Sequence, residues 1–280
     1  MTTMKRILKT ILSDRQLTCG VIMLLCLLFL VVAAPWLSPD DPYYYGPDVL
    51  AAPGSEGHPL GTNHLGQDVL SMIIYGVRTS LMVAVGAASI SALTGVIIGG
   101  VAGYFGGKVD AVLSEVINVF MMLPSFFLVL LVVALFGSSI TNVMICIGLT
   151  TWPSNARLMR AQALSLRERT FVQAARAMGE SRSQVLFKYI IPNGIFPVIA
   201  NTTLGMAGAI LTEAGLSFLG LGDPNIISWG QMIYAGKTYI TTAWWVSGFA
   251  GIATALTVLA FYLLGDGLNH VLDPKRKGRR

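Results

Sequence analysis

Residues Val116–Ala156 read VINVFMMLPSFFLVLLVVALFGSSITNVMICIGLTTWPSNA and contain no charged residue. A helix that crosses a membrane needs about 20 mostly apolar residues, so these 41 residues are long enough for two such helices. Gly137, Ser138 and Ser139 interrupt the stretch near its middle and favour a turn there. The stretch therefore predicts two membrane helices joined by a short turn.

The whole chain has the composition of a membrane protein. Of its 280 residues, 54% are hydrophobic and 12% are charged, and the mean hydropathy is +0.67. A soluble domain carries about 25% charged residues, so this chain has too little polar surface to cover a water-soluble globule of its size. The same figures exclude a disordered chain, a coiled coil and collagen. Cys19, Cys26 and Cys146 lie in apolar stretches and are interpreted as packing residues.

Further apolar stretches complete a set of six predicted transmembrane helices, and the fold class is an all-α integral membrane protein. These stretches are Leu17–Pro35, Thr79–Gly107, Tyr189–Thr212 and Thr238–Gly265. The first follows a basic start, as the apolar core of a signal peptide does. Its apolar part is long for a signal peptide, however, and Pro35-Trp36 stands where small cleavage-site residues are expected. We therefore interpret it as an uncleaved anchor.

The positions of the basic residues predict the orientation. With the N-terminus in the cytoplasm, 17 of the 19 Lys and Arg residues lie inside, and only Arg78 and Lys237 lie outside. Cytoplasmic loops are enriched in Lys and Arg, so both termini are predicted to be cytoplasmic. The net charge of +5 then reflects membrane orientation and not a nucleic acid partner. The predicted order is a cytoplasmic tail (1–16), the first membrane helix (17–35), an extracytoplasmic loop (36–78), a five-helix core (79–268) with a cytoplasmic loop at 157–192, and a basic cytoplasmic tail (269–280).

The inner loop Thr170–Pro192, TFVQAARAMGESRSQVLFKYIIP, predicts two short helices joined at a glycine. Thr170 with Gln173, and Ser181 with Gln184, have the spacing of capping boxes, and Gly179 suits the left-handed turn that ends a helix. Apolar residues recur at helical spacing in both halves: Phe171, Ala174, Ala175 and Met178 in the first, and Val185, Leu186, Tyr189 and Ile190 in the second. Pro192 is expected to limit the second helix. Such a hairpin either lies on the membrane surface or docks into a groove on a cytoplasmic partner.

The pattern Gln173-Ala174-Ala175, then Gly179, then Ile191-Pro192 resembles the EAA loop of ABC-importer permeases, which contacts the ATPase subunits. This sequence has Gln173 where that family usually has Glu. Because Gln also completes a capping box, the departure removes a charge and not the expected geometry. An ion pair from this position to the ATPase is not expected here.

Three further stretches are similar to segments of peptide and nickel permeases. They are His58–Val69 followed by Gly76–Leu81, where Asn63 and Gln67 replace the usual Asp and Arg; Glu213–Gly222 with Ser228–Gly230; and Gly265–Leu268 through Leu272–Pro274. Together with the inner loop they cover nearly the whole chain in the family's order. The resemblance is to the C-type permease subunit of dipeptide, oligopeptide and nickel ABC importers.

This resemblance implies a type I ABC importer permease fold in the cytoplasmic membrane, and alternating access driven by ATP. The implied partners are a homologous second permease, two cytoplasmic ATPase subunits, an extracytoplasmic substrate-binding protein and membrane lipid, with no nucleic acid. ATP and Mg are expected in the ATPases, so no cofactor is predicted for this chain. The expected substrate is a di- or oligopeptide, and the alternative is nickel or a metal chelate.

Other residues are weighed on their own chemistry. Gly95, Gly99 and Gly103 repeat every four residues, a spacing that lets helix backbones approach closely. Packing within the chain is favoured over packing on a partner. Glu213 and Asp266 are the acids inside or at the edge of predicted spans, where an acid is a candidate functional residue. A structural role is favoured for both, and Glu213 is expected to pair with Arg78 or with the Gly-rich turn that follows it.

No catalytic or metal site is predicted. His58 and His64 do not have a recognised metal-site spacing, and the stretch Gly230–Thr238 has one residue too many between its glycines for a phosphate-binding loop. Hydrolase signatures are also missing. A membrane-embedded enzyme and an ion-driven secondary transporter remain as rivals, each of which would need Glu213 or Asp266.

Overall fold

The computed structural model describes residues 14–272. Lys5, Arg6, Lys9 and the basic tail from Lys275 onward lie outside this part of the chain. The described backbone is helical, and it contains no β-structure beyond two isolated bridges in the outer loop. Its elements are α2 (Arg15–Leu37), α3 (Val69–Phe105), α4 (Gly107–Met122), α5 (Ser125–Phe136), α6 (Ile140–Leu166), α7 (Thr170–Ala177), α8 (Arg182–Val185), η1 (Leu186–Ile190), α9 (Ile191–Gly194), α10 (Phe196–Phe218), α11 (Trp229–Gly236), η2 (Lys237–Tyr239) and α12 (Trp244–Leu272).

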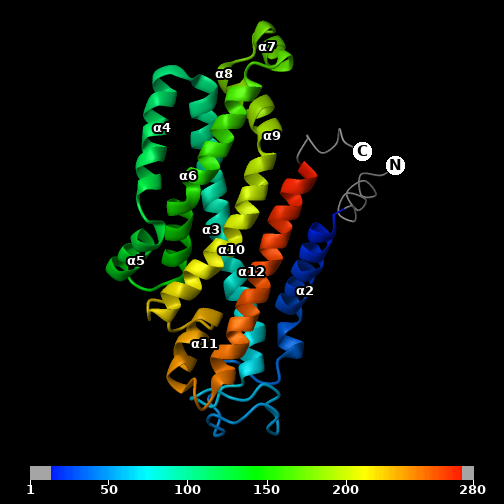
Figure 1. The fold of residues 1–280 in the computed structure, drawn as a ribbon, viewed down its shortest axis with the longest axis vertical. Helices are drawn as coiled ribbons and strands as arrows, with labels where there is room; N and C mark the ends of the chain where they lie inside the picture. Colours follow the sequence, from blue (N-terminus) through cyan, green and yellow to red (C-terminus); the bar gives the residue numbers. More distant parts are fainter. Residues whose placement is uncertain (1–13, 273–280) are drawn as a thin grey trace.

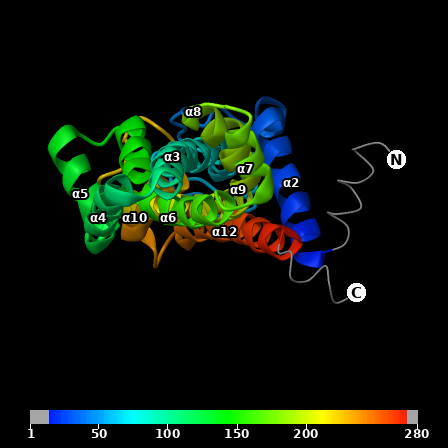
Figure 2. The same ribbon diagram turned by 90° about the horizontal axis from the view of Figure 1, so that it is seen from above.

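The long helices α2, α3, α6, α10 and α12 run alongside one another, as Figure 1 shows. The loop between α2 and α3 lies with α11 at one end of the bundle, and α7 and α8 lie at the other end. Seen from above in Figure 2, α2 and α5 occupy opposite flanks. The start of α2 and the end of α12 point toward the end that carries α7, which agrees with a shared cytoplasmic side for that loop and both tails.

Three helices, α2, α3 and α12, are long and apolar enough to cross a membrane alone. Two bent pairs, α4 with α5 and Arg182–Gly194 with α10, raise the number to five. α6 has 27 residues and is long enough to cross, but it carries polar and basic residues in its second half. The sixth span and the side of the termini therefore stay predictions.

The helix α3 begins ten residues earlier than the predicted span. Asp68 caps it by accepting a hydrogen bond from the Ser71 backbone N–H at 2.7 Å, and its 37 residues extend over about 55 Å. A hydrocarbon core is about 30 Å thick, so an end of α3 projects from the membrane. This length explains why the charged Arg78 lies inside the helix and does not mark its start.

Arg78 connects α3 to α2. Its Nε and Nη2 donate to the carbonyl oxygen of Val31 at 3.0 and 2.9 Å. In a regular helix this carbonyl would accept from the residue four positions later, which here is Pro35 and has no N–H. The arginine thus satisfies a carbonyl that the proline leaves free, and the expected pairing of Arg78 with Glu213 is wrong.

The charge-free stretch of the sequence contains two breaks. The predicted break at Gly137-Ser138-Ser139 is confirmed, since α5 ends at Phe136 and α6 begins at Ile140. A second break lies at Leu123-Pro124, where α4 and α5 bend by 80°. Residues before a proline avoid helical backbone angles, and Leu123 is extended with ψ 129°. The third predicted span is therefore an elbow and not a straight helix.

The glycines at four-residue spacing in α3 lie against α6. A Cβ at Gly95 would come within 2.5 Å of the Asn155 Cβ, and one at Gly99 or Gly103 would overlap backbone carbonyl oxygens of Ala156 or Arg160. The two helices therefore touch backbone to backbone within one chain. Such closeness is possible only because these positions carry no side chain.

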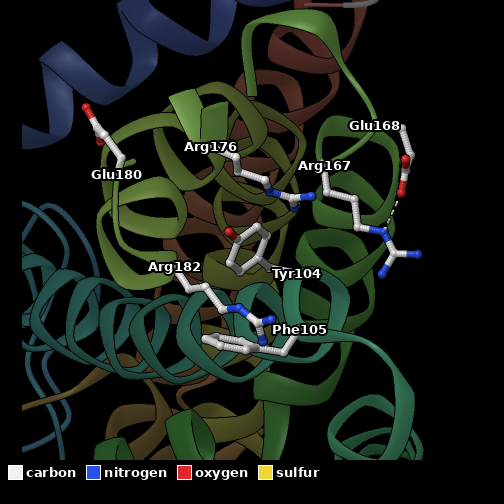
Figure 3. A pocket seen from close by; sticks show the side chains of 7 residues that line it. All are labelled: Tyr104, Phe105, Arg167, Glu168, Arg176, Glu180 and Arg182. Atoms are coloured by element: carbon white, nitrogen blue, oxygen red, sulfur yellow. Dashed lines mark hydrogen bonds and ion pairs between the residues drawn. The ribbon is translucent and has the colours of Figure 1, made fainter. Parts of the chain in front are cut away.

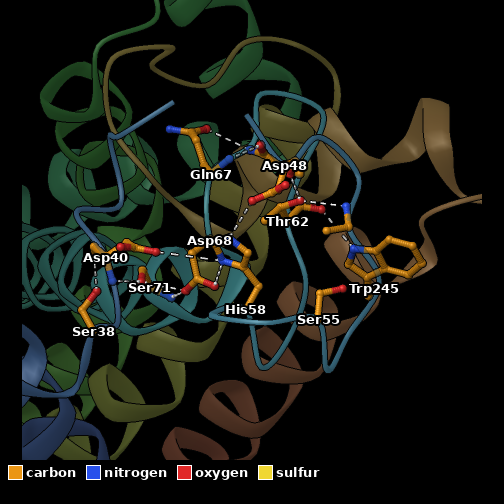
Figure 4. A network of polar contacts seen from close by, with 12 residues as sticks. Ser38, Asp40, Asp48, Ser55, His58, Thr62, Gln67, Asp68, Ser71 and Trp245 are labelled. Atoms are coloured by element: carbon orange, nitrogen blue, oxygen red, sulfur yellow. Dashed lines mark hydrogen bonds and ion pairs between the residues drawn. The ribbon is translucent and has the colours of Figure 1, made fainter. Parts of the chain in front are cut away.

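Hydrogen bonds hold the outer loop on the ends of α3 and α12 (Figure 4). The fully buried Asp68 carboxylate accepts from the Ser71 hydroxyl at 2.7 Å and lies 3.1 Å from His58 Nδ1. Trp245 Nε1 donates to the Thr62 carbonyl at 3.0 Å. His58 thus has a structural partner, and the loop is a folded cap on the outer end of the bundle.

Candidate functional site

The loop between α6 and α10 folds into the predicted helical hairpin. Gly179 takes φ +85° where α7 ends, and Ser181 with Gln184 forms a complete capping box at the start of α8, so both predictions are confirmed. The predicted capping box of Thr170 with Gln173 is wrong. The extended residue before α7 is Arg169, which places Thr170 inside the helix, and the Gln173 side chain donates to the Glu168 carbonyl at 3.3 Å.

The second helix of the hairpin leads toward α10, from which a bend of 60° at Ile195 separates it. It passes from α8 through a π-helical turn, η1, into α9. Pro192 lies in α9 and does not end the helix as predicted. Proline has no N–H to donate, and its ring clashes with the carbonyl four residues earlier, a conflict that a π-helical turn can accommodate. The hairpin is thereby joined by a helical segment to the bend that precedes α10.

One side of the hairpin is anchored in the core of the bundle. Val172 and Ala175 of α7 belong to one buried cluster with Tyr104 at the end of α3 and Met159 and Ala163 of α6. Val185, Leu186 and Ile190 from the second half of the hairpin complete this cluster. The hairpin is therefore fixed to α3 and α6, and it is not a free amphipathic segment.

The other side of α7 presents an exposed apolar stripe. Phe171 is 42% exposed and Met178 is 73% exposed, and Ala174 lies exposed between them. This stripe includes most of the apolar face expected from the sequence, but it points away from the bundle. An apolar stripe at helical spacing on an anchored helix is typical of a helix that docks in a partner's groove.

The residues that resemble the EAA loop are spread over both sides of the hairpin. Gln173, Ala174 and Gly179 are exposed, whereas Ala175 is buried. Ile191 is partly buried and Pro192 is exposed at the second helix. The exposed members are free to contact a partner, and the others hold the hairpin's shape.

A cleft of about 440 Å³ separates the hairpin from the end of α3. Figure 3 shows Arg176 and Arg182 on either side of Tyr104, with Phe105 below. The Arg176 guanidinium lies 5.1 Å from the centre of the Tyr104 ring, and Arg167 donates to the Gly103 carbonyl at 3.2 Å. The cleft is basic and aromatic. Arg176 connects α7 to the last turn of α3, and Arg167 connects the end of α6 to the same turn.

Glu180, which also lines the cleft, connects the turn after α7 to the second helix of the hairpin. Its Oε1 accepts from Lys188 Nζ at 2.9 Å and from the Tyr189 hydroxyl at 2.7 Å. The hydrogen bond from Lys188, followed by that from Tyr189, lowers the pKa of Glu180 from its ordinary value of 4.5. Because the folded hairpin favours the ionised carboxylate, Glu180 stabilises it above the ordinary pKa, and this contribution is lost as the pH falls through the lowered pKa.

We expect hydrogen exchange of the α7–α8 amides to accelerate when the pH is lowered through this range, after correction for the intrinsic exchange rate. Glu180→Gln cannot ionise, so its corrected exchange should be faster than wild type near neutral pH and should change little on acidification. Glu168→Gln is a matched control, since Glu168 is exposed and its carboxylate pairs with the neighbouring Arg167. Equal pH dependence in wild type and Glu180→Gln would contradict this assignment.

The two candidate acids take structural positions at opposite ends of the bundle. Glu213 is 3% exposed, and its Oε1 accepts from the Ser217 and Ser228 hydroxyls at 2.8 Å each. Asp266 lies 3.7 Å from His270 Nε2, and His270 Nδ1 lies 3.5 Å from Asp14, the residue that caps α2. Glu213 thus joins α10 to the start of α11, and Asp266 belongs to a contact between the ends of α2 and α12.

A group of neutral polar residues where α3, α6 and α10 meet was not predicted from the sequence. Asn155 of α6 is buried there, and it donates to the Ser91 hydroxyl of α3 at 3.0 Å and accepts from Asn201 of α10 at 2.9 Å. The available signal was the run Thr151, Ser154 and Asn155, which recurs at helical spacing inside the charge-free stretch.

Comparisons with known proteins agree with this architecture. The family described as "Binding-protein-dependent transport system inner membrane component" matches residues 95–278. The di/tripeptide transport system permease protein DppC of Pseudomonas aeruginosa is 36% identical over 92% of this chain and 88% of its own length. The dipeptide transport system permease protein DppC of Bacillus subtilis is 38% identical over 94% of this chain and 83% of its own.

A solved structure of similar fold is a chain of the inward-facing MetNI methionine ABC transporter. It covers 72% of this chain and 97% of its own length at 18% identity, with a TM-score of 0.57. At 18% identity, this structural similarity shows a shared fold and nothing about function. The family match over residues 95–278 spans the α3–α6 contact, the hairpin and α10 to α12, and it shows that the chain belongs to the binding-protein-dependent transport system inner membrane components.

Proposed function

We propose that this chain is the transmembrane permease subunit of an ATP-driven importer that moves di- and oligopeptides across the cytoplasmic membrane by alternating access. The related permeases are named for dipeptide and di/tripeptide transport, which supports a peptide over nickel. The partners are a homologous second permease, two cytoplasmic ATPases and an extracytoplasmic substrate-binding protein. ATP and Mg bind in the ATPases, and this chain carries out no catalysis of its own.

The proposed coupling of the ATPases to the permease helices is supported by one observation. This is the exposed apolar stripe of Phe171, Ala174 and Met178 on α7. Its opposite side is held by the buried contacts of Val172 and Ala175, so a force on the stripe reaches α3 and α6 without bending α7. The same hairpin continues through η1 and α9 toward α10. ATP-driven motion of the ATPases would therefore move these helices together and open the passage to one side at a time.

We expect the double substitution F171E/M178E to weaken binding of the ATPases by at least tenfold and to abolish dipeptide-dependent ATP hydrolysis. Burying a Phe or Met side chain contributes about 1.5–3 kcal/mol, and 1.4 kcal/mol corresponds to tenfold in affinity. The measurement is co-purification of the ATPases with the permease pair, with vesicle uptake of a labelled dipeptide as the second readout.

Ser183→Glu is the matched control, because Ser183 is exposed on α8 of the same hairpin and lies outside the stripe. It adds one carboxylate to the hairpin, and association and uptake are expected to persist. ATPase binding by F171E/M178E at the wild-type level would overturn the docking role of α7. Uptake driven by an ion gradient in the absence of the ATPases would overturn the importer itself.

A further inference from the structure

Neutral polar side chains are exposed near the midpoint of α6 and in the adjoining part of α10. Thr151 and Ser154 of α6 are exposed, and Asn201 of α10 is partly exposed beside them. Below, we call these three residues the polar patch. They lie well inside helices that form the bundle and not at its ends.

Hydrogen bonds to the helices hold the polar patch in place. Asn201 Nδ2 donates to the buried Asn155 Oδ1 at 2.9 Å and lies 3.4 Å from the Ser154 hydroxyl. Thr151 and Ser154 donate their hydroxyl protons to carbonyl oxygens of α6, at 2.8 and 3.0 Å. Their oxygens therefore keep acceptor capacity toward the open side. Within residues 14–272 no group donates to Asn201 Oδ1, which is likewise an available acceptor.

The surface beside the polar patch is open and smooth. A Cβ built on Gly205 or Gly208 of α10 meets no atom within 4 Å. A hollow of about 30 Å³ between the helices is lined by the polar patch together with Ser91, Asn155, Thr202 and apolar residues. None of the residues that line it is charged. Such a hollow has the size and the polar partners to hold a water molecule.

This face is unsuited to lipid. Hydrocarbon cannot hydrogen-bond to amides and hydroxyls, so polar groups at membrane depth face other protein or a water-filled cavity. Exposed apolar residues on the same helix have the opposite character, for example Leu149, which is 48% exposed. Helix α6 thus presents one face suited to lipid and one suited to water.

We propose that the polar patch lines the translocation passage and hydrogen-bonds the main-chain amides of the peptide cargo. The proposal rests on the proposed import of peptides. Hydroxyl and amide oxygens accept from the N–H groups that every peptide bond carries. A neutral patch also treats acidic and basic cargo alike, whereas a fixed charge would hold oppositely charged side chains and repel others. The patch therefore binds the main-chain N–H groups that all peptides share and does not discriminate between their side chains.

Cysteine accessibility in the assembled transporter, reconstituted in lipid nanodiscs, tests this proposal. In a background where Cys19, Cys26 and Cys146 are replaced by serine or alanine, S154C is compared with L149C on the same helix. The probe is a cationic, membrane-impermeant methanethiosulfonate. We expect S154C to be labelled at least tenfold faster than L149C, and saturating dialanine to slow S154C labelling at least threefold while free alanine does not.

Each outcome bears on the proposal. Labelling of S154C as slow as that of L149C would mean that the patch meets lipid or packed protein, and would overturn it. Rapid labelling without protection by dialanine, in a complex that takes up dialanine when it is reconstituted in vesicles, would overturn the amide contact. T151C replaces S154C if the latter does not assemble. A complex that takes up no peptide contradicts the proposed function instead, and the ratio of the S154C and L149C rates still decides whether the patch faces water.

Discussion

Gly99→Ala is expected to destabilise the protein by about 3 kcal/mol and to sharply reduce the yield of folded transporter. The added methyl group would overlap the backbone carbonyl of Ala156, and a backbone atom cannot rotate away as a side chain can. Overpacking typically costs about 1–3 kcal/mol, and this contact is at the upper end because both partners are helix backbones. The thermal unfolding midpoint of the detergent-purified chain, with its monodispersity on gel filtration, measures the effect.

Gly100→Ala is the matched control for Gly99→Ala. It lies one residue away on the same helix, and its nearest neighbour would be the Leu186 Cδ1 at 3.5 Å, an ordinary contact. Alanine favours a helix over glycine by about 1 kcal/mol, so this variant should unfold at the wild-type temperature or slightly above. Equal behaviour of the two variants would show that the close approach of α3 to α6 does not exist in solution.

Glu213→Ala is expected to cost about 3 kcal/mol and to release α11 from the end of α10. The change removes the acceptor of two buried hydroxyls, Ser217 and Ser228, and leaving a buried hydroxyl without its partner costs about 1–3 kcal/mol. Ser228 also caps α11 by accepting from the Gln231 N–H at 3.2 Å. Limited proteolysis within 222–243, alongside thermal unfolding, should therefore show that this segment opens first.

Glu213→Gln separates the role of the hydrogen bonds from that of charge. Glutamine keeps a carbonyl oxygen at the same distance, so most of the stability and the proteolytic protection should remain. The rival functions make a different prediction, because a proton-coupled carrier or a membrane enzyme using this carboxylate would lose its activity in Glu213→Gln as completely as in Glu213→Ala.

Much of the architecture could be predicted from local signals in the sequence. The break at Gly137-Ser138-Ser139 and the left-handed turn at Gly179 depend on the backbone freedom of particular residues, and both are found in the structure. The capping box of Ser181 is equally local. The resemblance of the inner loop to a permease motif led to the family, which the comparisons show.

The failures came from features that depend on residues far apart in the chain. Arg78 was expected just before the start of a span, yet it lies inside α3 and donates to the Val31 carbonyl that Pro35 of α2 leaves free. The outward direction of the Phe171 stripe could not be deduced from periodicity, which identifies an apolar face without saying what covers it. The polar patch could not be recognised from the positions of charged residues, because its amide and hydroxyl side chains are neutral and lie within predicted spans.

The glycine contact between α3 and α6 has a mechanical consequence for transport. Because α3 and α6 are in backbone contact at three successive turns, they can neither slide nor roll past one another. The pair therefore moves as one rigid body. Spin labels on α3 and α6 should then keep one separation in every nucleotide state, while distances from either helix to the second permease change. The rotation that accompanies transport then occurs at the interface between subunits. The hairpin and the polar patch, which are both attached to the α3–α6 pair, rotate together through the same angle.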